Sequence, residues 1–251
     1  RWLRTNRLNE LCEKFDRAAP DLVWSAGMRA WTIAAGLATE LKRPLVVQID
    51  GHHEARRLRK FARRQDVAAI ITPTEPLALA VRKWLPGREV ALIPPGIAGV
   101  ERESALRDRA EGGPLSLAIL GAAAAPAFHR ALFEALRAIR EVGPGARFVI
   151  ELPERGGHRV WQQLRRFELG DLATSVSDPV RVQRLLAASD LILRPAPEHR
   201  VRPIVLEAMG KGAPVVTVEE PWLDCLGPEQ GATVLTQPSA KAWEEALRQL
   251  M

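Results

Sequence analysis

Short apolar runs alternate with longer amphipathic stretches along the chain, and this alternation limits the folds that the chain can adopt. In the N-terminal part, short connections that contain Gly or Pro separate the segments. Strands joined by helices over such connections form parallel sheets with right-handed crossovers. The expected elements of this part are a helix at 2–17, a strand Leu22–Ala26, a helix Met28–Leu41, a strand Leu45–Asp50, a helix Glu54–Gln65, a strand Val67–Thr72, a helix Glu75–Trp84 and a strand Glu89–Ile93.

The alternation stops at residues 98–114, where charged residues surround a weakly apolar stretch that ends in Gly112-Gly113-Pro114. Such composition is typical of an interdomain linker. The pattern then restarts, so the sequence predicts an α/β chain of two Rossmann-like domains, 1–97 and 115–251. The expected elements after the linker are a strand Leu115–Leu120, a helix Pro126–Val142, a strand Arg147–Leu152, a helix Val160–Phe167, a strand Thr174–Val176, a helix Pro179–Ala188, a strand Leu191–Leu193, a helix from Pro203 to about Gly210–Gly212, a strand Ala213–Val218, a strand Thr233–Leu235 and a helix Ala240–Leu250 capped by Ser239.

The charge balance favours anionic partners. The 251 residues have a formal charge of +6 and a pI near 10.0, and residues 54–65 (EARRLRKFARRQ) form a strongly basic helix. This helix suggests contact with an anionic membrane surface, nucleic acid or a phosphorylated acceptor. The alternative is a solvated helix face with Leu58, Phe61 and Ala62 packed inward. Nucleic acid is disfavoured, because a chain without Tyr and with few Phe lacks a base-stacking platform.

The length of the apolar runs and the placement of the two cysteines bear on the expected cellular location. No apolar run is long enough for a spanning helix, and Cys12 and Cys225 are far apart. A cytoplasmic protein is therefore expected, with peripheral contact at the inner membrane face as an option. The chain begins with Arg1 rather than Met, as a fragment or a processed chain does.

A histidine pair follows the strand that ends at Asp50. His52 and His53 with Asp50 offer a base or metal ligands. Adjacent residues at a strand end point to opposite sides, so the pair is not expected to share one ion, and no metal site is predicted. Plain surface histidines are the alternative. Trp24, Trp31 and Trp84 lie in strand or helix patterns and are expected in the core.

Residues 190–218 (DLILRPAPEHRVRPIVLEAMGKGAPVVTV) form a strand–loop–helix–strand unit. The loop and the helix start lie at the carboxyl edge of a parallel sheet, where ligands bind. Glu198 and Glu207 frame that edge. A nucleotide site is one interpretation, with Glu207 accepting hydrogen bonds from ribose hydroxyls; an ordinary amphipathic helix is the other.

The segment VLEAMGKGAPVV resembles the C-terminal motif of family 4 glycosyltransferases, which have the GT-B fold. Further segments resemble that family in the same order, namely Asp21–Gly27, Leu45–Gly51, Asp66–Thr74, Glu89–Ile97 (ending IPPGI), Leu117–Gly121 and Ala187–Leu193 (AASDLIL). The resemblance implies two Rossmann-like domains of GT-B type. The N-terminal domain is short for the family, since only one helix precedes the segment matched by Asp21.

The chain departs from the family pattern at several site positions. The first acidic position of the family's E-x7-E motif holds His199, and Glu198 lies one place before it. Ala122 and Ala127 stand where the family has the Arg and Lys that neutralise the donor diphosphate. Asp50 stands where the family often has His. Substitutes for the missing cations are His129, Arg130, Arg200 or Arg202.

The resemblance implies a glycosyltransferase that moves a sugar from a nucleotide-sugar donor to an unknown acceptor, with retention and without a metal or other cofactor. Glu207 would hold the ribose, and Gly121 would allow close approach of phosphate. Arg200 and Arg202 would supply charge, and His199 with Glu198 would replace the acidic donor contact. The alternative is a non-catalytic binding or scaffold protein on this fold, or a truncated remnant that needs a partner chain.

Overall fold

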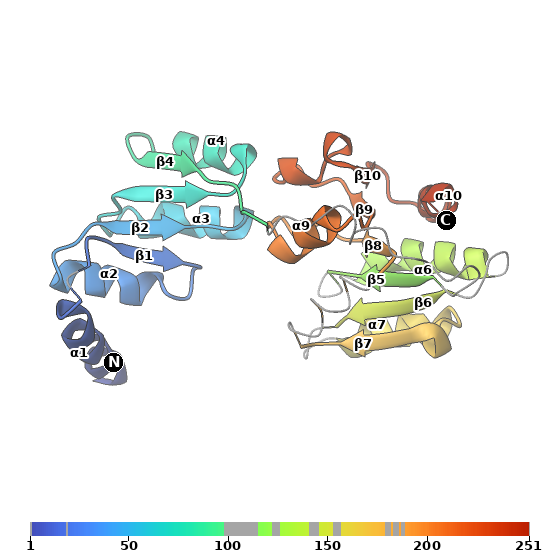
Figure 1. Cartoon of the computed structure of the whole chain (residues 1–251), viewed down its shortest axis with the longest axis horizontal. Coiled ribbons are helices and arrows are strands. Elements are labelled where there is room, and N and C mark those ends of the chain that lie inside the picture. The colour runs from blue at the N-terminus through green and yellow to red at the C-terminus, as the bar shows by residue number, and fades with distance from the viewer. Residues whose placement is uncertain are drawn as a thin grey trace. The chain divides into compact units, whose positions relative to one another are not determined.

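The computed structural model of the chain describes residues 2–18, 20–97, 115–121, 126–140, 146–152, 157–178, 182, 186 and 189–250. The chain divides into two compact units, each with its own parallel sheet (Figure 1). The first unit contains residues up to Pro95 together with His199–Val201 and Pro221–Asp224. The second unit contains Gly96–Glu198, Arg202–Glu220 and Cys225–Met251. The predicted α/β class with two parallel sheets is confirmed.

The first unit is built on a four-stranded parallel sheet in the order β1-β2-β3-β4. The core residues are the alternate, inward-facing members of these strands and the apolar faces of the helices, with Val47, Ile70 and Leu58 fully buried. The elements, in chain order, are α1 (Trp2–Asp16), β1 (Val23–Ala26), α2 (Trp31–Glu40), β2 (Leu45–Gln48), α3 (His52–Phe61), β3 (Ala69–Thr72), α4 (Glu75–Trp84) and β4 (Glu89–Leu92).

One face of this sheet is covered more fully than the other. Each strand pairs with the next strand in sequence, so right-handed crossovers place α2, α3 and α4 on the same face. Val23 and Ser25 of β1 point to that face and are buried. Trp24 points to the opposite face with 58% of its surface exposed. The prediction that Trp24 is a core residue is therefore wrong, whereas Trp31 is buried as expected.

The second unit is built on a six-stranded parallel sheet in the order β10-β9-β8-β5-β6-β7. All four residues of β8 and of β9 are buried, as expected for central strands covered on both faces. The elements are β5 (Ser116–Ile119), α6 (Pro126–Arg140), β6 (Arg147–Glu151), α7 (Gly157–Arg166), a 3-10 turn η1 (Gly170–Leu172), β7 (Ala173–Val176), β8 (Leu191–Arg194), α9 (Pro203–Gly210), β9 (Val215–Val218), the 3-10 turns η2 (Asp224–Leu226) and η3 (Pro228–Gln230), β10 (Ala232–Leu235) and α10 (Ala240–Leu250).

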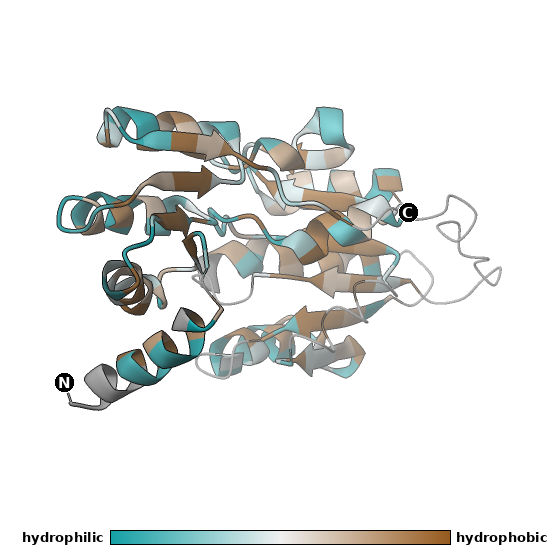
Figure 2. Ribbon diagram, turned by 60° about the vertical axis from the view of Figure 1, so that its left-hand side comes forward, coloured by the Kyte–Doolittle hydropathy of each residue, from teal (hydrophilic) through white to brown (hydrophobic). Residues whose placement is uncertain are grey.

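The core of the second unit forms where α6 and α10 pack against each other and against the sheet. Phe133 and Trp243 are fully buried there, and the strands are mainly brown in the hydropathy colouring of Figure 2. Ser239 caps α10 as predicted, because its Oγ accepts a hydrogen bond from the Ala242 N–H at 3.2 Å.

Most predicted elements lie within a few residues of their observed bounds. The main correction concerns α3, which begins at His52 rather than Glu54 and ends at Phe61 rather than Gln65. The carboxylate of Glu54 folds back and accepts the Asp50 N–H at 2.8 Å, and this bond draws the histidine pair into the first turn. The expected linker 98–114 lies outside the described residues, as does almost all of the expected helix 179–188. Among the described residues, no helix has the length and apolar character of a membrane span.

Candidate functional site

Polar residues gather where four strands of the second unit end. Gly121 follows β5, Glu151 ends β6, Arg194 ends β8 and Glu220 follows β9. The carboxyl ends of parallel strands meet at one edge of a sheet, which is where ligands bind in this architecture. Glu198 and Arg202, from the loop between β8 and α9, join them through hydrogen bonds. We call these six residues the edge cluster.

Arg202 is held between two carboxylates of the edge cluster. Its Nη1 and Nη2 donate to the two carboxylate oxygens of Glu151 at 2.6 and 2.7 Å, a bidentate pair. Nη1 also donates to Glu198 Oε1 at 3.3 Å. Burial alone would lower the pKa of Arg202, but the hydrogen bonds and negative charges of Glu151 and Glu198 outweigh burial and raise it. The predicted phosphate-binding arginine is thus already neutralised by the chain's own carboxylates.

Gly121 adopts a conformation that suits glycine. Its φ is +76°, in the left-handed region, and a Cβ placed there would lie 3.1 Å from Glu198 Oε1. Its N–H donates to Glu151 Oε2 at 3.5 Å. The two carboxylates that hold Arg202 therefore also lie beside the glycine that was predicted to admit a phosphate group.

The edge cluster also contains a buried ion pair, formed by Arg194 and Glu220. Arg194 Nη2 lies 2.5 Å from Glu220 Oε1, and both side chains are only 1% exposed. Glu220 Oε2 also accepts the Glu198 N–H at 3.1 Å, which fixes the loop. Nε and Nη1 of Arg194 find no acceptor among the described residues, and buried donors without an acceptor are costly. This pair was not predicted from the sequence, although an arginine directly after the apolar residues Leu191–Leu193 is unusual for a buried strand.

Glu207, the predicted ribose ligand, lies in the second half of α9 and is half-buried. α9 begins at Pro203, directly after Arg202, so the positive end of the helix adjoins the edge cluster. No side chain caps that end: Arg202 is the N-cap residue and forms no cap hydrogen bond. This leaves the first N–H groups of α9 without a side-chain acceptor from the N-cap residue.

A second polar group lies at the end of β2 in the first unit. The His52 N–H donates to the His199 carbonyl at 2.9 Å, and the Val201 N–H donates to the Asp50 carbonyl at 3.0 Å. Gly51 and Arg200 form an antiparallel bridge between these bonds, and a Cβ on Gly51 would lie 2.4 Å from the His199 carbonyl oxygen. Residues 199–201 therefore pack tightly on the strand end, and His199 has a φ of +53°, uncommon for a non-glycine residue.

His52 is fixed by aromatic contacts. Its ring stacks on Trp222 with centroids 4.2 Å apart and an interplanar angle of 17°. Trp222 is in turn held by its carbonyl, which accepts the Thr74 hydroxyl at 2.9 Å. Burial, the charge of Arg56 and the neighbouring histidines His199 and His53 lower the pKa of His52. Its imidazole is therefore mainly neutral at pH 7 and can accept a proton.

The predicted site residues thus fall into two groups. Glu198, Arg202 and Gly121 meet in the edge cluster of the second unit. Asp50, His199 and Arg200 meet at the end of β2 in the first unit, where Arg200 is exposed. Glu198 and His199, predicted to act together, are consecutive in sequence but contact different units. Among the described residues, no three His, Cys, Asp or Glu side chains are placed to hold a metal ion.

Comparison with known proteins finds the fold but no sequence relative. No family model matches the chain, and no curated protein sequence matches it. Among solved structures, a glycosyltransferase from Rickettsia africae is similar with a TM-score of 0.70 at 12% identity, covering 99% of this chain and 71% of that chain. Staphylococcus aureus TarM, solved with UDP, has a TM-score of 0.73 at 11% identity over 97% of this chain and 51% of that one. The UDP-GlcNAc 2-epimerase from Methanocaldococcus jannaschii has a TM-score of 0.58 at 15% identity over 98% and 74%.

These similarities establish the fold that the sequence predicted. Glycosyltransferases and UDP-GlcNAc 2-epimerases are among the solved structures similar to this chain, which has two Rossmann-like parallel sheets. The chain therefore has a glycosyltransferase-like fold of GT-B type. Identities this low describe architecture, so chemistry has to be argued from the residues.

Proposed function

We propose that this chain binds a nucleotide sugar at the edge cluster of the second unit and acts as a glycosyltransferase. The observation that supports this most directly is Gly121, a left-handed glycine just after the first strand of the unit, whose N–H donates to the same Glu151 oxygen that accepts from Arg202. Such a turn at the carboxyl edge of a parallel sheet suits a phosphate group. Similar solved structures contain UDP, which favours a nucleotide as the ligand.

In this proposal each predicted residue of the second unit has one role. Glu207 accepts hydrogen bonds from the ribose, and Gly121 lets the diphosphate approach the backbone. Arg202 supplies positive charge and exchanges Glu151 for phosphate when the donor binds. Glu198 replaces the acidic donor contact of family 4. The roles predicted for His199, Arg200 and Asp50 are not part of this proposal, because these three residues belong to the first unit. Transfer with retention and without a metal is what the family resemblance implies.

A second candidate is a non-catalytic binding or scaffold protein on the same fold. The bidentate pair between Arg202 and Glu151 favours it, because the arginine that shares Glu151 with the Gly121 N–H is already satisfied within the chain. Ala122 and Ala127 also leave two cation positions of the family empty. A site that neutralises itself gains less from binding a diphosphate.

Nucleotide binding tests both candidates. We expect thermal stabilisation by UDP, GDP or ADP, or by one of their sugar conjugates, at millimolar concentration. Glu207→Ala should weaken this binding about 10- to 100-fold, because hydrogen bonds to a charged group contribute about 1.5–3 kcal/mol. Glu229→Ala, which removes an exposed carboxylate elsewhere in the same unit, is the control.

Three outcomes separate the candidates. Stabilisation by none of the nucleotides would contradict a nucleotide site of either kind. Binding that Glu207→Ala leaves unchanged would mean that the site is misplaced. Binding of a sugar conjugate without its hydrolysis or transfer to any acceptor, measured by release of the free nucleotide, would favour the non-catalytic protein.

A further inference from the structure

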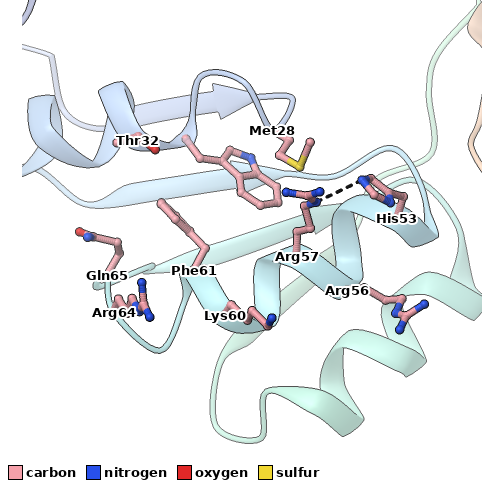
Figure 3. Close-up of a pocket in the computed structure, with 10 residues that line it drawn as sticks. Met28, Thr32, His53, Arg56, Arg57, Lys60, Phe61, Arg64 and Gln65 are labelled. Carbon is pink, nitrogen blue, oxygen red and sulfur yellow. Dashed lines mark hydrogen bonds between the residues drawn. The ribbon is translucent and has the colours of Figure 1, made fainter. Parts of the chain in front are cut away.

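A groove of about 880 Å³ runs between α2 and α3 of the first unit. Figure 3 shows Met28 and His53 near one end and Gln65 near the other, with α3 side chains between them. Its volume lies in the range of small-molecule sites. The lining residues are Met28, Trp31, Thr32, His53, Arg56, Arg57, Lys60, Phe61, Arg64 and Gln65.

The wall that α3 provides is positively charged. Arg56 and Lys60 lie four residues apart on one side of α3, and Arg64 lies in the turn that follows the helix. Arg57 lies beside them and donates to His53 Nε2 at 3.2 Å. No carboxylate lines the groove, and none of the described carboxylates forms an ion pair with these four cations. Unpaired cations lining one groove concentrate positive potential there.

The floor of the groove is apolar and aromatic. Trp31 is only 3% exposed, and its ring centroid lies 5.3 Å from that of Phe61 at an angle of 37°. Met28 lies at the end of the groove near His53 (Figure 3). The indole N–H of Trp31 finds no acceptor within the described chain. A ligand that fits this groove therefore combines an anionic group with an apolar or aromatic body.

We propose that this groove is a binding site for a phosphate group that is attached to an apolar or aromatic body. Phosphate offers the acceptor oxygens that a row of arginines recognises, and the apolar body covers Trp31 and Phe61. A phospholipid and a soluble aryl phosphate both present this chemistry. The site lies wholly in the first unit, so it does not rest on nucleotide binding by the edge cluster.

The helix itself provides a matched control. Arg59 and Arg63 belong to the same basic segment and are exposed, but they do not line the groove. A simple attraction between a basic helix and any anion would use these two arginines as well as the groove cations. Binding in the groove depends on Arg56 and Lys60 and is nearly independent of Arg59 and Arg63.

The test uses the full chain and two probes. One probe is a vesicle of phosphatidylcholine with phosphatidic acid, compared with phosphatidylcholine alone in a flotation assay. The other is 1-naphthyl phosphate, compared with inorganic phosphate by calorimetry. We expect the chain to bind vesicles with phosphatidic acid more tightly than phosphatidylcholine alone, or 1-naphthyl phosphate more tightly than inorganic phosphate, or both. Arg56→Ala/Lys60→Ala should weaken that binding about 30-fold, because each cation near a phosphate surface contributes about 1 kcal/mol.

The controls decide between specific and general binding. Arg59→Ala/Arg63→Ala should bind like the unsubstituted chain, and Phe61→Ala should weaken the aromatic or lipid probe but not inorganic phosphate. All four substituted cations are exposed, so circular dichroism should confirm that both double variants fold. Preference for the vesicle identifies a lipid source, and preference for 1-naphthyl phosphate a soluble one.

Several results would overturn the proposal. One is the absence of binding to both phosphate-bearing probes; another is an equal loss in the two double variants. Equal affinity for inorganic phosphate and 1-naphthyl phosphate would show that Trp31 and Phe61 do not contribute to binding. Displacement of the probe by a short single-stranded oligonucleotide at lower concentration would assign the groove to nucleic acid instead.

Discussion

The bidentate pair between Arg202 and Glu151 gives the sharpest test of the edge cluster. Glu151→Gln keeps the shape of the side chain but removes the charge and one acceptor. Two hydrogen bonds to charged groups contribute about 3–6 kcal/mol when fully buried. Here the side chains of Arg202 and Glu151 are 12% and 26% exposed, and Arg202 keeps Glu198 at 3.3 Å. Solvent screening and the second carboxylate reduce the expected loss to about 2 kcal/mol.

Thermal and urea denaturation measure this loss. A destabilisation of about 2 kcal/mol lowers the Tm by about 4–8 °C for a chain of this size. A double-mutant cycle with Arg202→Met isolates the pair and should give a coupling of about 2 kcal/mol. Glu168→Gln is the control, because Glu168 pairs with Arg137 at 3.6 Å on the surface with half or more of each side chain exposed. That pair should couple by less than about 1 kcal/mol.

The same substitution probes the proposed function. Glu151→Gln weakens the hold on Arg202 and removes a negative charge beside Gly121, so UDP, GDP or ADP should bind more tightly to the variant than to the original chain. A coupling as small as that of the Glu168 control would refute the structural argument. Unchanged or weaker nucleotide affinity in a folded Glu151→Gln variant would exclude Arg202 from the phosphate site.

Three further predictions concern other described residues. Gly121→Ala should destabilise the chain by more than Gly231→Ala, measured by urea denaturation. Both glycines have φ near +80°, which costs an alanine about 1–2 kcal/mol, but only Gly121 has a side chain, Glu198, within 4 Å of its added methyl group. The Tm should fall as pH drops below about 6.5, because the pKa of His52 is lowered in the folded chain and the unfolded chain therefore binds more protons than the folded one. His52→Phe should make the Tm depend less steeply on pH in this range. Trp24→Ser should change the Tm little and raise solubility, because Trp24 is 58% exposed.

Each of these expectations has a contrary outcome. Equal losses for the two glycine variants would mean that Glu198 moves away from residue 121 at no cost. A pH dependence that His52→Phe leaves intact would place the titrating group elsewhere. A loss of several degrees on Trp24→Ser would show that the tryptophan is covered in solution.

Local sequence patterns predicted the elements better than they predicted the site. α4 has the predicted bounds and α9 begins at Pro203 as predicted, because proline in the first turn is a strong local determinant. Trp24 was misplaced because alternation within a strand says which residues share a face, not which face a helix covers. That choice depends on strand order, a property of the whole sheet.

The edge cluster shows the limit of such patterns. Glu151, Arg194 and Glu220 end or follow three strands that are far apart in sequence, and their pairing depends on the strand order β9-β8-β5-β6. The resemblance to family 4 directed attention to Gly121 and Arg202 but could not show that Glu151 neutralises Arg202. Similarly, local patterns could not show that the His199 carbonyl accepts the His52 N–H, a contact between residues 147 positions apart in the sequence.

The contacts of Trp222 with His52 and Thr74 also affect when the first unit can complete its folding during synthesis. The Thr74 hydroxyl and the Trp222 carbonyl that it binds are separated by 148 residues. A ribosome adds roughly 5–20 residues per second, so the first unit waits roughly 7–30 s for the segment that completes it. During that interval His52, Thr74 and the strand end at Asp50 have no partners from residues 199–201 and 221–224. Most of the first unit therefore emerges from the ribosome before the second unit, but the first unit is complete only after residues 221–224 have been added.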